Sequence, residues 1–132
     1  MKHARGRSGG LPSQEGTGTF TGRVLLDPVL AAGNARVNSV MFEPGGRTYW
    51  HSHDDGQVLI VGTGRGMVAT RDGEQHVLAA GDTVYAPPGE EHWHGAAPDS
   101  LLLHTAVSLG TTRWFDEVTP DQYKAAWDEN GQ

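Results

Sequence analysis

The feature that most constrains this chain is a series of short apolar runs, each broken by a turn that contains glycine or proline. Apolar and polar residues alternate within these runs, which is typical of strands with one buried face. Between two of the runs, Asp72-Gly73 is a strong signal for a two-residue hairpin turn. The strands expected from this pattern are Phe20–Leu26, Ala35–Phe42, Thr48–His53, Gln57–Val61, Gly66–Arg71, Gln75–Leu78, Thr83–Ala86, His92–Gly95 and Leu101–Ser108.

So many short strands, together with 19 glycines and 7 prolines, favour an all-β fold over a helical bundle. Closing the sheet into a barrel would protect the strand edges. Only the end of the chain has a helical pattern. Thr119 can cap a helix that starts at Pro120, and Gln122 completes a capping box. Tyr123 and Trp127 then share one face, which can pack on the barrel.

A length of 132 residues predicts a single domain. Residues 1–18 have almost nothing to bury and are expected to form a disordered tail. Residues 19–118 are expected to form the barrel and residues 119–132 the helix that packs on it. Trp114 and Phe115 are expected to pack this last segment onto the barrel or onto a second subunit, and a homodimer is predicted.

The charge and composition exclude several classes of partner. The net charge is −6 and the pI about 5.5, so no nucleic acid or anionic membrane is expected as a partner. The chain has no cysteine, which excludes disulfides and thiolate ligands. No run of apolar residues reaches the roughly 18 to 20 needed for a membrane span. The first ten residues lack the apolar core of a secretory signal. We expect a cytoplasmic protein that acts on a small molecule.

The histidines carry the first signal of chemistry. His51 and His53 lie two apart on an expected strand, so their side chains point to the same face and can bind one metal ion together. Imidazole suits Mn, Fe, Co, Ni, Cu and Zn. Such a pair, taken alone, is also compatible with an exposed strand face. Its surroundings therefore decide the interpretation.

Two stretches around the histidines have defined spacings. The first is Gly45, five residues, His51, one residue, His53, three residues, Gln57, six residues and Gly64; the second is Gly81, five residues, Pro87, one residue, Gly89, two residues and His92. These spacings resemble the two sequence motifs of the cupin family, and the resemblance covers about residues 35–108.

The resemblance implies a cupin-type double-stranded β-helix, or jelly-roll, barrel. It also implies that His51, His53 and His92 bind one divalent transition metal ion and that Gln57 is the fourth ligand. Gln57 stands where the family usually has Glu, and Ala96 stands where the second motif often ends in Asn. The alternative is a site held by the histidines alone.

Gln57 has a physical consequence for such a site. A carboxylate would cancel one of the two charges of the ion, whereas an amide and three neutral imidazoles cancel none. The site is therefore expected to favour anionic ligands and to acidify a bound hydroxyl more than a carboxylate-bearing site would.

Four further residues are candidates for the same cavity or its mouth. His94 shares the face of His92 and is expected to line the cavity, with ligation or proton transfer as alternatives. His104 lies in an apolar strand, so it either faces the cavity or is a hydrogen-bonded core residue. A neutral imidazole facing the cavity can act as a general base. Tyr49 shares the parity of His51, and Arg47 is placed at the mouth, where it could attract an anion.

A closer resemblance is to the small bacterial cupins that include manganese-dependent hydroxynitrile lyases. It rests on residues 42–57, residues 88–98 and the segment from Val118 to Tyr123. It implies manganese as the metal and His104 as the base that removes a proton from a cyanohydrin. The positions expected to line the pocket include Asn38, Val40 and Ser108, although Asn38 and Ser108 differ from the residues that the resemblance leads one to expect.

Three functions are compatible with these residues. The first is a metal-dependent lyase that performs acid–base chemistry on a small carbonyl or hydroxy compound. The second is a mononuclear non-haem dioxygenase, because three histidines and an oxygen donor also suit iron. The third is a binding module for a small ligand without catalysis. Manganese is the expected ion, and iron, zinc, nickel and cobalt are the alternatives.

Overall fold

The structure is a computed structural model, and it describes residues 1–6 and 12–130. Within these residues the chain forms strands almost throughout and ends in one short helix, α1, Pro120–Glu129. The strands are β1 Gln14–Glu15, β2 Phe20–Thr21, β3 Val24–Ala32, β4 Ala35–Phe42, β5 Arg47–Thr48, β6 His51–His53, β7 Gly56–Thr70, β8 Gln75–Ala79, β9 Thr83–Ala86, β10 His92–Ala96, β11 Leu102–Leu109 and β12 Thr112–Trp114.

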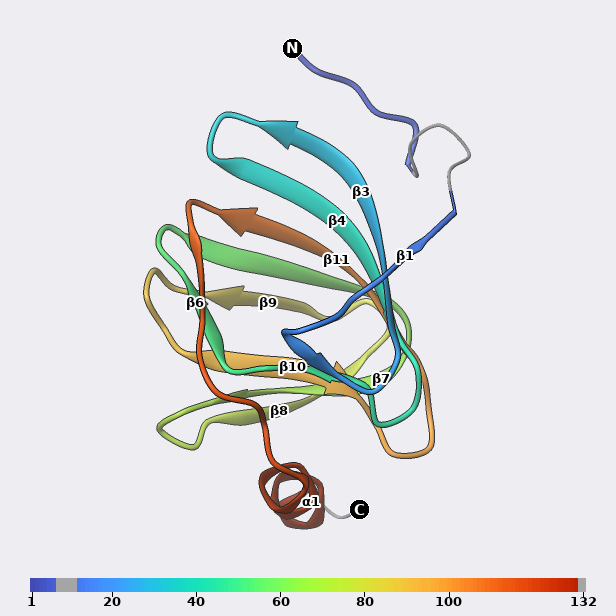
Figure 1. Cartoon of the computed structure of the whole chain (residues 1–132), viewed down its shortest axis with the longest axis vertical. Helices are drawn as coiled ribbons and strands as arrows, with labels where there is room; N and C mark the ends of the chain where they lie inside the picture. Colours follow the sequence, from blue (N-terminus) through green and yellow to red (C-terminus); the bar gives the residue numbers. More distant parts are fainter. Residues whose placement is uncertain (7–11, 131–132) are drawn as a thin grey trace.

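The strands form two antiparallel layers that share the long strand β7 (Figure 1). The first layer runs β1, β3, β4, β11, β7 and β9. The second contains β8, β7, β10, β5 and β2, and β6 and β12 extend it beside β10. The sheet curls on itself as a half-open barrel, with α1 against the outside of the second layer. The predicted all-β architecture with a short C-terminal helix is confirmed.

Strand β7 differs most from the sequence prediction. The sequence predicts two strands here, Gln57–Val61 and Gly66–Arg71. The structure instead has one strand of 15 residues that passes from the first layer into the second. Gly64 has a φ of +88°, and a Cβ at this position would collide with the carbonyl oxygen of Leu101. These glycines therefore let the strand bend between layers without ending it.

Other parts of the strand prediction also differ from the structure. The expected strand Phe20–Leu26 divides into β2 and β3 at Gly22, which has a φ of +77°. The expected strand Thr48–His53 divides into β5 and β6, and β12 was not expected. In the predicted disordered tail, Gln14 and Glu15 instead form a short strand that pairs with Leu26 and Leu25. This pairing uses backbone hydrogen bonds, which the composition of the tail does not predict. Part of the predicted tail, residues 7–11, lies outside the described residues, as do residues 131–132 of the predicted helix.

Two apolar cores hold the layers in place. One fills the barrel and includes Phe42 and Leu102, both fully buried. The other lies between the second layer and α1 and includes Trp93 and Trp127. As the sequence predicts, Thr119 caps the helix in a capping box with Gln122, and Tyr123 and Trp127 are buried on its inner face.

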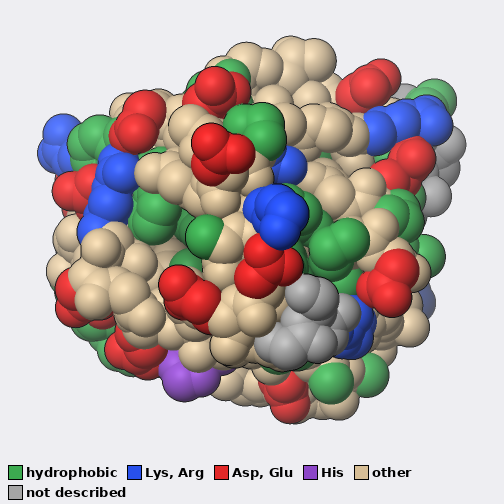
Figure 2. Space-filling view, turned by 90° about the horizontal axis from the view of Figure 1, so that it is seen from below, with side chains coloured by type: hydrophobic (Ala, Val, Ile, Leu, Met, Phe, Trp, Pro, Cys, Tyr) green, Lys and Arg blue, Asp and Glu red, His purple; other side chains and the backbone are tan. Residues whose placement is uncertain are grey.

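The outer surface carries mixed charges on the side where α1 lies. Viewed from that side, acidic and basic side chains are interspersed with scattered hydrophobic ones, and neither sign of charge forms a continuous patch (Figure 2). No helix within the described residues is long and apolar enough to cross a membrane.

Candidate metal centre

Strands β6 and β10 bring three histidines together inside the barrel. The alternation of β6 turns His51 and His53 to the same face, and the register of β10 against β6 sets His92 opposite His51. All three side chains are buried. Each offers one ring nitrogen, and these three nitrogens lie within 4.8 Å of one another. The cluster that the spacing predicts is therefore present as a geometric unit that could hold a metal ion.

Hydrogen bonds orient the imidazole rings. Nδ1 of His51 lies 2.8 Å from the carbonyl oxygen of Tyr49, and Nδ1 of His92 lies 3.0 Å from that of Glu90. A carbonyl oxygen only accepts hydrogen bonds, so Nδ1 carries the hydrogen in both rings and Nε2 keeps its lone pair. This pattern, with one ring nitrogen held by the protein and the other left free, is the usual one for histidines that bind metal.

His53 shows the same pattern. Its Nδ1 lies 2.9 Å from the hydroxyl oxygen of Thr112, on β12. Its Nε2 is buried and has no hydrogen-bond partner among the described residues. A buried polar atom without a partner is costly unless a ligand satisfies it. The orphaned Nε2 therefore fits a metal-binding role.

Gln57 faces the cluster from β7. Its carbonyl oxygen Oε1 lies 3.0 Å from Nε2 of His92, and its amide Nε2 donates to the hydroxyl of Ser108 over 3.0 Å. If Nε2 of His92 carries a lone pair, two acceptors face each other, and a cation beside them would make this arrangement favourable. Turning the amide over would place a donor toward His92 instead. The orientation of the Gln57 amide is thus tied to metal binding.

The electrostatics of the cluster favour neutral imidazoles. Burial lowers the pKa of His53 to about 4, and the neighbouring His92 adds to this shift. Burial also lowers the pKa of His92, and burial together with His92 lowers the pKa of His51 well below its usual value. Neutral imidazole is the form that binds metal. The histidine cluster itself contains no carboxylate, so a divalent ion held there would keep its full charge.

His94 and His104 form a second buried pair next to the cluster. Nε2 of His104 lies 3.0 Å from Nδ1 of His94. The His94 ring also contacts the ring of His51, with centroids 5.1 Å apart. Burial lowers the pKa of His104 to about 4. Burial also lowers the pKa of His94 well below its usual value, and the neighbouring His104 adds to this shift. Both rings are therefore neutral near pH 7 and can accept a proton.

A cavity of about 450 Å³ lies beside the cluster, between the two layers. We call it the histidine cavity. Among the predicted pocket residues, Asn38, Val40, His94 and Ser108 line it. His104 does not line it, and contacts the cavity residue His94 from the interior. The complete lining is Glu15, Gly16, Thr17, Thr19, Phe20, Leu26, Arg36, Asn38, Val40, Phe42, Thr48, His51, His53, His94, Ser108, Thr112 and Trp114.

Two predicted positions differ from the structure. Tyr49 does not line the histidine cavity, because the chain leaves strand geometry between β5 and β6 and the parity with His51 is lost. Arg47 is not at the mouth. It is 7% exposed, donates two hydrogen bonds to the carbonyl oxygen of Val118 and lies 4.6 Å from the ring centre of Tyr123. It holds the C-terminal segment instead of attracting an anion.

The cavity residues that sequence reasoning missed include Arg36, Thr112 and Trp114. Arg36 lies two residues before Asn38 on β4, so the alternation of that strand could have identified it. Thr112 and Trp114 come from β12, a strand that the sequence pattern does not predict. With Glu15, Arg36 brings one cation and one anion to the cavity lining.

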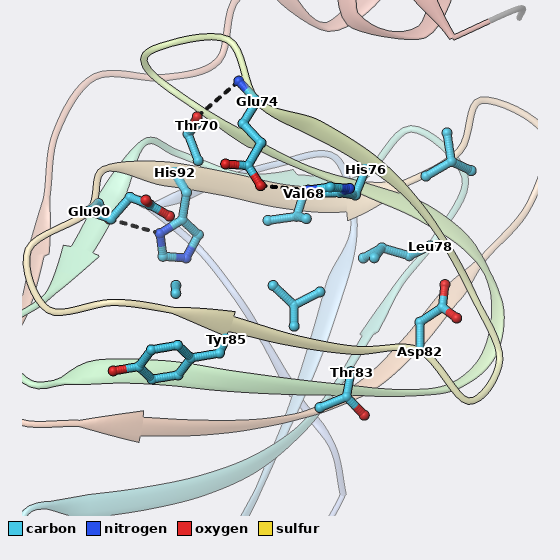
Figure 3. A pocket seen from close by; sticks show the side chains of 13 residues that line it. Val68, Thr70, Glu74, His76, Leu78, Asp82, Thr83, Tyr85, Glu90 and His92 are labelled. Carbon is cyan, nitrogen blue, oxygen red and sulfur yellow. Dashed lines mark hydrogen bonds and ion pairs between the residues drawn. The ribbon is translucent and has the colours of Figure 1, made fainter.

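His92 also lines a second cavity, of about 390 Å³, enclosed by β7, β8 and β9. In Figure 3 the His92 ring lies at one end of this cavity beside Glu90, and the paired side chains of Glu74 and His76 lie along its upper side. The three-histidine cluster therefore stands between two cavities.

Comparisons with known proteins agree with this geometry. A family model described as the cupin domain matches residues 38–104. An (R)-mandelonitrile lyase of Granulicella tundricola is 41% identical over 112 residues, which cover 80% of this chain and 86% of that protein. A cupin-like protein of Thermotoga maritima has a similar solved structure, with a TM-score of 0.82, 40% identity and coverage of 85% of this chain and 91% of that one.

A further solved structure extends the similarity of fold. A predicted oxalate decarboxylase of Thermotoga maritima has a TM-score of 0.70 at 20% identity and covers 80% of this chain and 97% of its own. At this level of identity the similarity concerns the fold alone. The family model and the close relatives confirm the cupin-type barrel that the sequence predicts. On this evidence the chain belongs to the cupin family.

Proposed function

We propose that this cupin binds one divalent transition metal ion, manganese in the first instance, through His51, His53, His92 and the carbonyl oxygen of Gln57. The observation that carries the proposal is the convergence of three buried histidine nitrogens within 4.8 Å, with Nδ1 of each ring held by a protein oxygen. Nε2 of His53 has no hydrogen-bond partner among the described residues. The oxygen of Gln57 facing His92 adds a fourth donor. When bound, such an ion supplies Lewis acidity that makes a substrate hydroxyl easier to deprotonate.

We further propose a lyase reaction on a small cyanohydrin or related hydroxy compound. The printed activity of the relative from Granulicella tundricola, 41% identical to this chain, supports this reaction class. In the reaction a base removes the hydroxyl proton, the oxygen forms the carbonyl double bond, and the carbon–carbon bond to the nitrile breaks with its electron pair leaving as cyanide. Cyanide takes up the proton to give hydrogen cyanide, so no oxidant or reductant is needed.

The proposed base is the His94–His104 pair. The sequence assigns this role to His104, and we extend it to His94, because His94 lines the histidine cavity and His104 hydrogen-bonds to it from the interior. When Nδ1 of His94 donates to Nε2 of His104, Nε2 of His94 keeps a lone pair that can take the substrate proton. His104 then holds His94 in this tautomer.

The experiment combines metal analysis with turnover. Purified wild type and His53→Ala are dialysed with MnCl₂ and measured by elemental analysis, and both are assayed for cleavage of mandelonitrile. We expect about one equivalent of manganese and measurable cleavage for wild type, and loss of both for His53→Ala. His76→Ala, an exposed histidine outside the cluster, is the matched control.

The outcomes separate the candidate functions. Wild type without metal would refute the metal site. Bound manganese without cleavage of any cyanohydrin would refute the lyase and leave the binding module. Oxygen consumption by the iron-loaded protein would favour the dioxygenase.

A further inference from the structure

We infer that Ser108 is a positioning residue that holds the Gln57 amide against the three-histidine cluster in both the metal-free and the metal-bound protein. This inference rests on the proposed metal site. It concerns a residue that neither the two motifs nor the histidine spacing includes.

The register of the first layer sets the two residues side by side. Ser108 on β11 pairs directly with Gln57 on β7, so the two side chains leave the same face of the sheet next to each other. The hydroxyl oxygen of Ser108 lies 3.0 Å from Nε2 of Gln57, and the other end of the same amide lies 3.0 Å from Nε2 of His92. The Gln57 side chain, 3% exposed, is thus held at both ends.

The chemistry of the three groups makes Ser108 suited to this position. An amide has a donor end and an acceptor end, whereas a hydroxyl both donates and accepts. With the carbonyl oxygen toward the cluster, Ser108 accepts from the amide nitrogen, as the structure shows. With the amide turned over, the nitrogen donates to the lone pair of His92, and the Ser108 hydroxyl donates to the carbonyl oxygen. Ser108 therefore satisfies the far end of the amide in either orientation.

This arrangement allows Gln57 to change roles without moving its backbone. In the metal-free protein the turned amide satisfies His92, and in the metal-bound protein the carbonyl oxygen faces the ion. Without the Ser108 hydroxyl, the far end of a buried amide has lost its partner in both states, and the side chain is free to leave the cluster. Groups that orient metal ligands in this way typically contribute 10- to 100-fold to metal affinity.

The test measures metal binding instead of activity. Calorimetric titration with Mn²⁺ compares four proteins: wild type, Ser108→Ala, Gln57→Ala and the double variant. Their visible spectra are also recorded after loading with Co²⁺, because the spectrum of bound Co²⁺ depends on its ligands. We expect Ser108→Ala to weaken Mn²⁺ binding about 10-fold and to change the Co²⁺ spectrum. The double variant is expected to bind no more weakly than Gln57→Ala, because Ser108 acts through Gln57.

Two further variants control for structure. Ser108→Thr keeps the hydroxyl and is expected to restore affinity to within about three-fold of wild type. Ser39→Ala removes a hydroxyl from β4 on the face opposite to the cavity residues Asn38 and Val40. It is expected to change neither the Mn²⁺ affinity nor the Co²⁺ spectrum. If Ser108→Ala does not fold, Ser108→Cys tests the same contact with a weaker hydrogen-bonding group.

The results distinguish this inference from the proposed function. Failure of wild type to bind Mn²⁺ or Co²⁺ would refute the metal site itself. Metal binding by wild type with an unchanged dissociation constant and spectrum in Ser108→Ala would overturn the inference alone. Equal losses for Ser108→Ala in the wild-type and Gln57→Ala backgrounds would also overturn it.

Discussion

Nε2 of His104 lies 3.0 Å from Nδ1 of His94, and both rings are buried beside the three-histidine cluster. Only one hydrogen can lie between these two nitrogens, so the tautomer of one ring determines that of the other. A proton taken up at the free nitrogen of His94 is therefore linked to His104, although His104 does not line the histidine cavity.

Replacing His104 with Ala is expected to lower turnover without removing the metal. The variant loses the group that fixes the tautomer of His94, and general-base contributions of this kind are typically 10²- to 10⁴-fold. We expect kcat for cyanohydrin cleavage to fall about 100-fold, with a manganese content equal to that of wild type. An unchanged kcat in His104→Ala would contradict the role of the pair, and His76→Ala serves again as the control.

The stability of the metal-free protein is expected to fall in acid through His104. Burial lowers the pKa of His104 from its usual 6.5 to about 4 in the folded protein. Between these values the unfolded chain binds a proton at this position and the folded chain does not. The free energy of unfolding therefore rises with pH across this window. The contribution from neutral His104 is fully present above about pH 6.5 and is lost as the pH falls toward about 4.

For one histidine the expected slope is about 1.4 kcal/mol per pH unit. Urea unfolding of the chelator-treated protein at several pH values between about 4 and 6.5 measures this slope. His104→Gln is the comparison, since it keeps a polar side chain that does not titrate, and its slope is expected to be smaller by that amount. Equal slopes in the two proteins would contradict the prediction.

Replacing Gln57 with Glu is expected to bind metal more tightly and to turn over more slowly. The carboxylate adds a negative charge to a cluster of neutral imidazoles and cancels one charge of the ion. A bound hydroxyl is then less acidic, and we expect kcat to fall about 10-fold while the Mn²⁺ dissociation constant decreases. Calorimetry and the cleavage assay measure the two quantities. Weaker metal binding by Gln57→Glu would show that Gln57 does not face the ion.

Arg47→Met is expected to destabilise the attachment of the C-terminal segment. The guanidinium donates twice to the carbonyl oxygen of Val118 and lies over the Tyr123 ring, and both contacts are lost. A loss of about 2–3 kcal/mol in the free energy of unfolding is expected. Denaturant unfolding measures it. Arg113→Met, which breaks an exposed ion pair with Asp54, is expected to have a clearly smaller effect, because solvent screens such a pair. Equal effects would contradict a structural role for Arg47.

Much of the architecture could be predicted from local sequence. Turn residues and alternation predict an all-β fold, and the signals for a helix from Thr119 are confirmed because a capping box is made entirely within one turn. The two motifs predict the cupin family because they specify residues at defined spacings. Strand alternation predicts that His51 and His53 share a face, and the family resemblance implies that His92 joins them, as the structure shows.

Strand pairing determined which residues from distant parts of the chain surround the three histidines. The alternation of a strand tells which residues share a face, but the register against other strands decides how deep each residue lies. This is why His94 lines the histidine cavity and His104 lies in the interior, and why Arg47 contacts Val118. The same register sets Ser108 beside Gln57, residues 51 apart in the sequence. The sequence alone determined the family and the histidines of the site. Only the tertiary structure determined the neighbours of these histidines, because contacts between distant strands depend on strand pairing that no local pattern encodes.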